Sequence, residues 1–195
     1  MNLMNTIDPH TTALVLIDLQ EGILPFAKGP RTSDAVLEAS TRLIKRFREA
    51  RAPIVFVRVG PSPDLGDWLR QSVDQPSPAP ANGLPANWWT FPAELGVSER
   101  DILITKRQWN AFYGTEFDLQ LRRRGVRTIV LGGISTNIGV ESTARAAFER
   151  TYSLVLVEDA MSCASAEQHE ASVRFIFPRL GHVRSTDQVL AAFGA

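Results

Sequence analysis

Short apolar runs recur along the chain, and most of the segments between them place apolar residues at helical spacing. Runs of this length that are rich in Val, Ile and Leu are typical of strands buried on both faces of a parallel sheet. The pattern therefore predicts an α/β fold, with a parallel sheet covered by helices on both faces. Strands are expected at 12–17, 54–59, 101–105, 128–131 and 152–157 with a short edge strand at 182–184, and helices at 33–50, 115–124, 140–150, 165–177 and from 186 onward.

The expected helices carry local signals for their buried faces and their ends. Apolar residues share one face of the helix at 33–50 (Val36, Ala39, Leu43, Ile44 and Phe47) and of the helix at 140–150 (Ala144, Ala147 and Phe148). Capping-box patterns open three helices, at Thr115, Ser165 and Ser185. Gly125 is expected to end the second helix.

The segment from about 61 to 92 differs from the rest of a chain that we interpret as one domain, residues 1–195. It holds seven of the twelve prolines and three of the four tryptophans. We expect a lid-like excursion with little regular structure, apart from one short helix around 65–73. Long loops in compact domains tend to be functional or disordered, and the tryptophans favour a functional loop because disordered segments are poor in aromatic residues. The sequence leaves open whether the tryptophans line a pocket or fill a subunit interface.

Composition excludes several classes of partner. Lys plus Arg and Asp plus Glu both number 21, and this zero net charge argues against nucleic acid binding. No apolar stretch is long enough to span a membrane, and the first residues lack the pattern of a signal peptide. One cysteine excludes an internal disulfide and suits a reducing compartment, so we expect a cytoplasmic protein.

Polar and small residues follow three of the predicted strands. Asp18 follows the first strand, Lys106 ends the third, and a Gly- and Ser/Thr-bearing turn from Ile134 to Gly139 ends the fourth. Right-handed crossovers bring the carboxyl ends of parallel strands to one edge of the sheet, where such folds bind ligands. The turn leads into a helix, whose first N–H groups attract anions. Together these residues predict acid–base chemistry beside an anion site.

Three segments that carry these residues resemble motifs of the isochorismatase-like hydrolases, also called the cysteine hydrolase superfamily. They are 13–20 with Asp18, 105–115 with Lys106, and 133–145. The resemblance covers nearly the whole chain. It implies a three-layer, Rossmann-like fold with a six-stranded parallel sheet, catalytic roles for Asp18 and Lys106, and a homo-oligomer. It also implies a cis peptide bond between Ile134 and Ser135.

One position departs from the amidase branch of that family. Gly139 occupies the position of the nucleophilic cysteine, so no thioester can form there. The single cysteine, Cys163, comes 24 residues later; it is read as a small buried residue, with a replacement nucleophile as the alternative. His10, His169 and His182 form no Asp-x-His pattern and are interpreted as surface or capping residues. We therefore predict no metal and no cofactor.

The resemblance to the branch with glycine at this position implies hydrolysis of a vinyl ether such as isochorismate, which releases pyruvate. Asp18 is the expected general acid, and this role requires that burial raise its pKa against the opposing effect of Lys106. Two alternatives stay open. One is an amide hydrolase that uses Cys163 or an activated water, and the other is a non-catalytic oligomeric binding protein.

Candidate substrate contacts come from the turn and from the loops around it. We expect a small anionic substrate to contact Ser135, Ile138, Trp89, Phe112 and Arg107. Arg107 is also a candidate for a carboxylate clamp with Arg58, because arginine binds carboxylates in a bidentate way.

Overall fold

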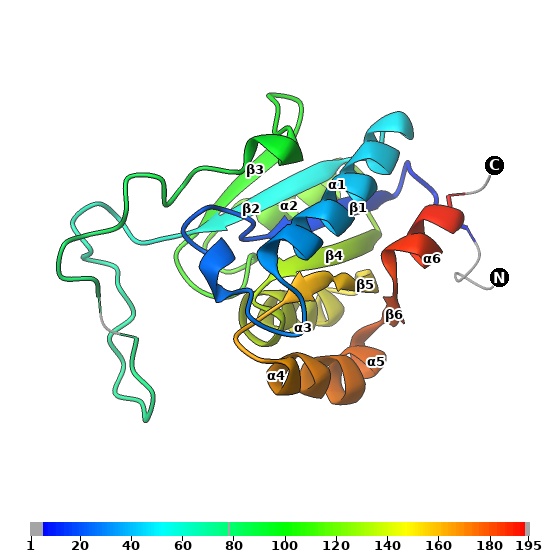
Figure 1. Ribbon diagram of the computed structural model, residues 1–195. Helices are drawn as coiled ribbons and strands as arrows, with labels where there is room; N and C mark the ends of the chain where they lie inside the picture. The colour runs from blue at the N-terminus through cyan, green and yellow to red at the C-terminus, as the bar shows by residue number, and fades with distance from the viewer. Residues whose placement is uncertain (1–5, 78, 194–195) are drawn as a thin grey trace.

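Six parallel strands form one sheet with the order β3-β2-β1-β4-β5-β6, and helices cover both of its faces (Figure 1). The computed structural model describes residues 6–77 and 79–193. The strands are β1 Thr12–Ile17, β2 Ile54–Val59, β3 Ile102–Lys106, β4 Thr128–Ile134, β5 Ser153–Ser162 and β6 His182–Arg184. The predicted α/β class, the parallel sheet and the edge strand at 182–184 are confirmed.

The helices divide between the two faces of the sheet. They are α1 Ser33–Glu49, α2 Phe117–Arg123, α3 Glu141–Glu149, α4 Ala166–Ala171, α5 Phe177–Leu180 and α6 Thr186–Ala191. Residues of α1 and α6 share one apolar core with the sheet, and residues of α2, α3 and α5 share the other. All five apolar residues predicted for the inner face of α1 are buried. None of the helices in the described ranges is long and apolar enough to cross a membrane.

Two strands are longer than their apolar runs predicted. β4 continues past the expected strand end at Leu131, through Gly132 and Gly133 to Ile134, so the turn begins at Ser135 rather than at Ile134. At Gly133 the φ angle is +126°, and a Cβ atom would lie 2.1 Å from the Ile17 carbonyl oxygen. Glycine therefore lets β4 approach β1 closely. β5 likewise runs past its expected end at 158–159 to Ser162.

Local capping signals were only partly reliable. Ser185 forms the predicted capping box with Gln188. Thr115 does not cap α2, which begins at Phe117; its hydroxyl instead donates to the Ala111 carbonyl and accepts from the Phe117 N–H. The hydroxyl thus closes the preceding loop. Phe148 is 51% exposed rather than buried, because α3 turns its small residues toward the sheet.

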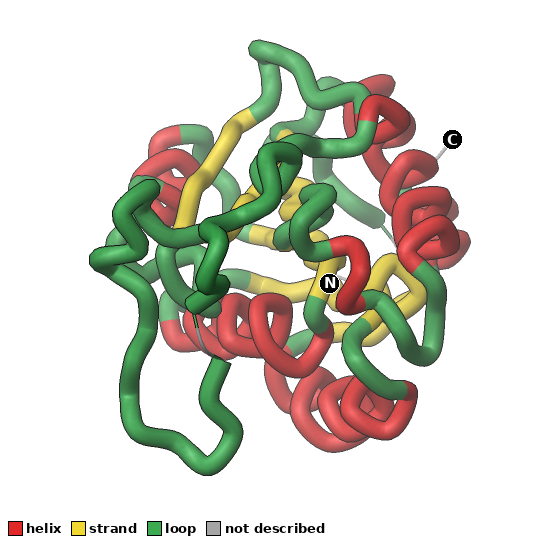
Figure 2. Tube along the Cα trace, turned by 60° about the vertical axis from the view of Figure 1, so that its left-hand side comes forward, coloured by secondary structure: helices red, strands yellow, loops and turns green. Residues whose placement is uncertain are grey.

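The excursion over 61–92 stands away from the sheet as a long loop (Figures 1 and 2). The helix expected around 65–73 is absent, since these residues form turns and irregular backbone. The returning end of the excursion is fastened to the sheet. Gln20 Nε2 donates to the carbonyls of Val59 and Trp88, at 3.0 and 2.8 Å, and Trp88 Nε1 donates to the same Val59 carbonyl at 2.8 Å.

Candidate active site

The strand order reverses between β1 and β4, and this is where open α/β sheets bind their ligands. Asp18 follows β1 at this point, and its N–H donates to the Val57 carbonyl of β2 at 2.8 Å. Its φ angle is +54°, a left-handed conformation that Asp tolerates better than most residues. The extended conformation of β1 therefore ends at Asp18, at the carboxyl edge of the sheet.

Lys106 reaches Asp18 from a strand that is not its neighbour. It is the last residue of β3, and β2 lies between β3 and β1. Its Nζ lies 2.7 Å from Asp18 Oδ2 and donates to the Trp109 carbonyl at 2.6 Å. Both side chains are almost fully buried, with exposed fractions of 1% for Lys106 and 6% for Asp18. The structure therefore brings together the first two residues predicted for the site.

Gly139, the third predicted position, lies beside Asp18 and Lys106. The peptide bond between Ile134 and Ser135 is cis, as expected, and one turn of π-helix follows at Thr136–Val140. A Cβ atom on Gly139 would lie 3.2 Å from Asp18 Oδ2 and 3.3 Å from Lys106 Nζ. A side chain at position 139 would therefore point directly at the acid and the ammonium group.

Burial controls the protonation of the Asp18 carboxyl group. Desolvation raises the pKa of Asp18 to about 6, while the charge and hydrogen bond of Lys106 act in the opposite direction. Asp18 Oδ1 is buried and has no hydrogen-bond partner among the described residues. Asp18 therefore exchanges its proton near neutral pH and keeps one oxygen available for hydrogen bonding.

A buried histidine, which the sequence did not indicate, supports the turn. His169 Nδ1 lies 2.9 Å from Thr136 Oγ1, and its Nε2 lies 3.8 Å from Glu158 Oε2. His169, together with Arg31, lowers the pKa of Glu158. The interpretation of His169 as a surface or capping residue is wrong, whereas His10 and His182 are exposed.

The predicted substrate contacts separate into three environments. Ser135 and Ile138 belong to the turn beside Gly139, where the Ser135 carbonyl accepts from the Ile138 and Val140 N–H groups. Phe112 is instead buried in the core, with its ring 4.6 Å from that of Phe117. It therefore offers little surface to a ligand.

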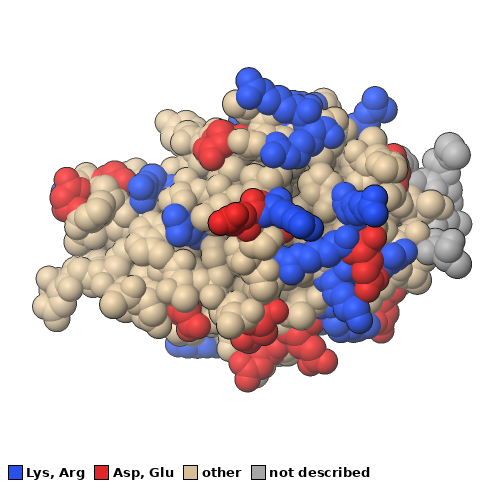
Figure 3. Space-filling view, turned by 90° about the horizontal axis from the view of Figure 1, so that it is seen from above, with Lys and Arg blue, Asp and Glu red and all other residues tan. Residues whose placement is uncertain are grey.

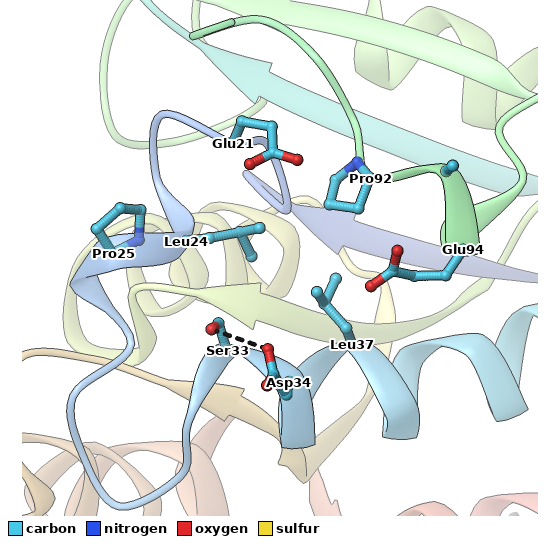
Figure 4. Close-up of a pocket in the computed structure, with 9 residues that line it drawn as sticks. Glu21, Leu24, Pro25, Ser33, Asp34, Leu37, Pro92 and Glu94 are labelled. Atoms are coloured by element: carbon cyan, nitrogen blue, oxygen red, sulfur yellow. Dashed lines mark hydrogen bonds between the residues drawn. The ribbon is translucent and has the colours of Figure 1, made fainter.

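Trp89 and Arg107 lie elsewhere and line one cavity together with Arg58. A second cavity, of about 390 Å³, lies between the segment after β1, the start of α1 and residues 92–94. Glu21, Asp34 and Glu94 reach it from these three segments (Figure 4). Neither Asp18 nor Lys106 lines either cavity.

Cys163 fits the interpretation of a small buried residue. Its Sγ donates to the Ser165 carbonyl at 3.2 Å, and its backbone pairs with Gly29 in a short antiparallel bridge. None of its described contacts reaches Asp18 or Lys106. In the described part of the chain, no three His, Cys, Asp or Glu side chains group as metal ligands do.

Comparison with known proteins agrees with this arrangement. The model of the isochorismatase domain matches residues 12–188, from β1 into α6. The chain belongs to the isochorismatase family. This family consists of hydrolases.

Three relatives show how broadly the likeness extends. An uncharacterized isochorismatase family protein of Escherichia coli O157:H7, YecD, is 57% identical over 97% of this chain and all of its own length. A solved isochorismatase family protein of Burkholderia thailandensis has a TM-score of 0.91 and 43% identity, over 97% of this chain and 98% of its own. Ureidoacrylate amidohydrolase RutB of Acinetobacter baylyi is 38% identical over 95% of this chain and 84% of its own length.

Proposed function

We propose that this hydrolase acts on a small anionic substrate through Asp18 and Lys106, without a covalent nucleophile. The observation that carries the proposal is Gly139, because its missing side chain would have faced both Asp18 Oδ2 and Lys106 Nζ. A cysteine there would place a thiol against the acid and the ammonium group. Glycine leaves that space to substrate or water.

The first candidate reaction is hydrolysis of a vinyl ether such as isochorismate. Protonated Asp18 delivers its proton to the terminal vinyl carbon, and the adjacent ether carbon becomes oxocarbenium-like. Water adds to that carbon and returns a proton to the Asp18 carboxylate. The resulting hemiketal breaks its ether bond, and pyruvate and the alcohol leave. A pKa of about 6 for Asp18 supports this role, since a useful fraction stays protonated near neutral pH.

The second candidate is hydrolysis of an amide or ureido C–N bond. The relative RutB is named as a ureidoacrylate amidohydrolase. In this chain the ionised Asp18 would accept a proton from water, which would attack the carbonyl carbon directly. The likeness to RutB favours this candidate, whereas the ether candidate rests on Gly139 and on the raised pKa of Asp18.

The test measures both reactions on the same protein. Pyruvate release from isochorismate and ammonia release from ureidoacrylate are followed for the wild type, for Asp18→Asn and for Asp74→Asn, which changes an exposed aspartate. We expect a loss of about 100-fold or more in Asp18→Asn, the scale of general acid–base catalysis, and no change in Asp74→Asn. Turnover that survives in Asp18→Asn would overturn the proposed site. An absence of turnover of either substrate by folded wild type would favour a non-catalytic binding protein.

A further inference from the structure

A cavity of about 700 Å³ lies between the carboxyl ends of β2 and β3 and the excursion. This volume is within the range of small-molecule sites in proteins. Polar side chains line it from the strand ends (Arg58, Thr105 and Arg107), and the excursion supplies Trp89, prolines and leucines. At the left of Figure 3, where the excursion stands out from the molecule, most of the surface is tan, with a few red and blue side chains along its upper edge.

The strand register separates this cavity from the candidate active site. Arg58 pairs with Thr105, and Val59 pairs with Lys106. Successive side chains on a strand point to opposite faces of the sheet, so Arg58 and Thr105 leave the sheet on the side opposite to Lys106. Ile104, on the Lys106 side, belongs to the core under α2 and α3, whereas Phe56, on the Arg58 side, belongs to the core under α1.

Two guanidinium groups lie close to the ring of Trp89. The Cζ atoms of Arg58 and Arg107 lie 5.3 and 5.8 Å from its centroid, which is cation–π distance. Arg107 is held by protein acceptors, since its Nη1 donates to the Gly60 and Pro61 carbonyls and its Nε lies 3.6 Å from Asp67 Oδ2. Arg107 therefore acts mainly as a fixed wall of the cavity.

Arg58 has fewer protein hydrogen-bond acceptors than Arg107. Its Nε donates to Thr105 Oγ1 at 2.9 Å, and this bond fixes the plane of the guanidinium group. Its two terminal nitrogens have no acceptor among the described residues, although Arg58 lines the cavity. A guanidinium group with an oriented plane and available terminal donors suits a carboxylate, which accepts two parallel hydrogen bonds.

We propose that this cavity is a second ligand site, separate from Asp18 and Lys106, that binds a small aromatic carboxylate. The carboxylate accepts hydrogen bonds from Arg58, and the flat apolar body packs against the Trp89 ring and the prolines of the excursion. Among the described residues Arg58 forms no ion pair with a carboxylate, and Asp67 already pairs with Arg107. An inorganic anion would satisfy the arginine but leave the apolar wall uncovered.

Benzoate is the probe, and the readout is the indole N–H resonance of Trp89 in the full chain. The resonance is assigned by its loss in Trp89→Phe. We expect saturable shifts with benzoate, and binding at least 10-fold weaker with benzamide, which has the same shape without the charge. Arg58→Met should weaken benzoate at least 10-fold. Arg58→Lys, which keeps the charge but not the paired donors, should lie between the two.

Three outcomes would overturn the second site. Equal affinity for benzoate and inorganic phosphate would remove the role of the apolar wall. Unchanged benzoate affinity in Arg58→Met, with an unaltered melting temperature, would show that Arg58 does not hold the carboxylate. Loss of benzoate binding in Asp18→Asn but not in Arg58→Met would place the probe in the active site. Thr105→Val serves as a second variant, since it removes only the acceptor that orients Arg58.

Discussion

Lys106 Nζ lies 2.7 Å from Asp18 Oδ2, although β2 separates the strands that carry the two residues. The contact is possible because the lysine side chain is long and because β2 ends at Val59, level with Lys106. Both groups are buried, so each charge depends on the other. Removal of one partner leaves the other in a place where water does not solvate it well.

The protonation of Asp18 predicts opposite pH profiles for the two candidate reactions. Burial raises the pKa of Asp18 from 3.8 to about 6. A general acid works in its protonated form, so kcat/KM for the ether should fall as pH rises through about 6. A general base works as the carboxylate, so kcat/KM for the amide should rise through the same pH. Profiles from about pH 5 to about pH 8 separate the two roles.

Lys106→Met should raise the pKa of Asp18 and thereby shift the pH dependence of kcat/KM. Lys106 lowers the pKa of Asp18 through its charge and hydrogen bond, so its removal leaves desolvation unopposed. We expect the titrating limb of kcat/KM to shift by about 1 to 3 pH units to higher pH. Lys45→Met, on the exposed side of α1, is the matched control. If kcat/KM changed at the same pH in both variants, the coupling between Lys106 and Asp18 would be contradicted.

Gly139→Ala should impair the site by crowding it. The added methyl group would lie 3.0 Å from Ile17 Cγ2 and 3.2 Å from Asp18 Oδ2, closer than ordinary contact. We expect kcat/KM to fall at least about 10-fold, with an overpacking cost of about 1–3 kcal/mol in urea unfolding. Wild-type turnover in Gly139→Ala would show that the reaction does not use this space.

His169→Ala should loosen the turn that carries Gly139. The change leaves the buried Thr136 hydroxyl without its partner, which costs about 1–3 kcal/mol of unfolding free energy. kcat should fall as well, because the turn positions Gly139 against Asp18. His182→Ala alters an exposed histidine and should change neither quantity. Equal stability of the two variants would contradict a supporting role for His169.

Native protein should resist alkylation of Cys163. The thiol is fully buried and donates to the Ser165 carbonyl. Treatment with iodoacetamide should leave both the mass of the native protein and its turnover unchanged, while denatured protein gains one adduct. Rapid labelling of native protein together with loss of turnover would revive Cys163 as a replacement nucleophile.

The alternation of strands and helices was predictable because each buried strand is a continuous apolar run. The edge at which Asp18, Lys106 and the turn meet followed from strand direction alone. Two features depended on tertiary contacts instead. Lys106 was expected at a common edge, but the sequence did not show that it must cross the end of β2. The apolar run of the fourth strand ends at Leu131, whereas Gly132 and Gly133 continue the strand in close packing against β1.

Errors in local detail have the same origin. Thr115 has the spacing of a helix cap, yet a carbonyl of the preceding loop competes for its hydroxyl. Phe148 shares a face with Ala144 and Ala147 by spacing, but the small residues of α3 pack against the sheet and leave the ring outside. His169 and Thr136 are 33 residues apart, so no local pattern links them.

The way in which Gln20 and Trp88 fasten the returning end of the excursion to Val59 bears on how this part of the chain can evolve. Their three hydrogen bonds fix the point at which the loop rejoins the sheet, whatever its course in between. The entropy cost of closing a flexible loop grows only with the logarithm of its length. Insertions and deletions between 62 and 85 can therefore accumulate without displacing Asp18 or Lys106. The excursion is thus the segment in which ligand preference can diversify while the chemistry stays constant.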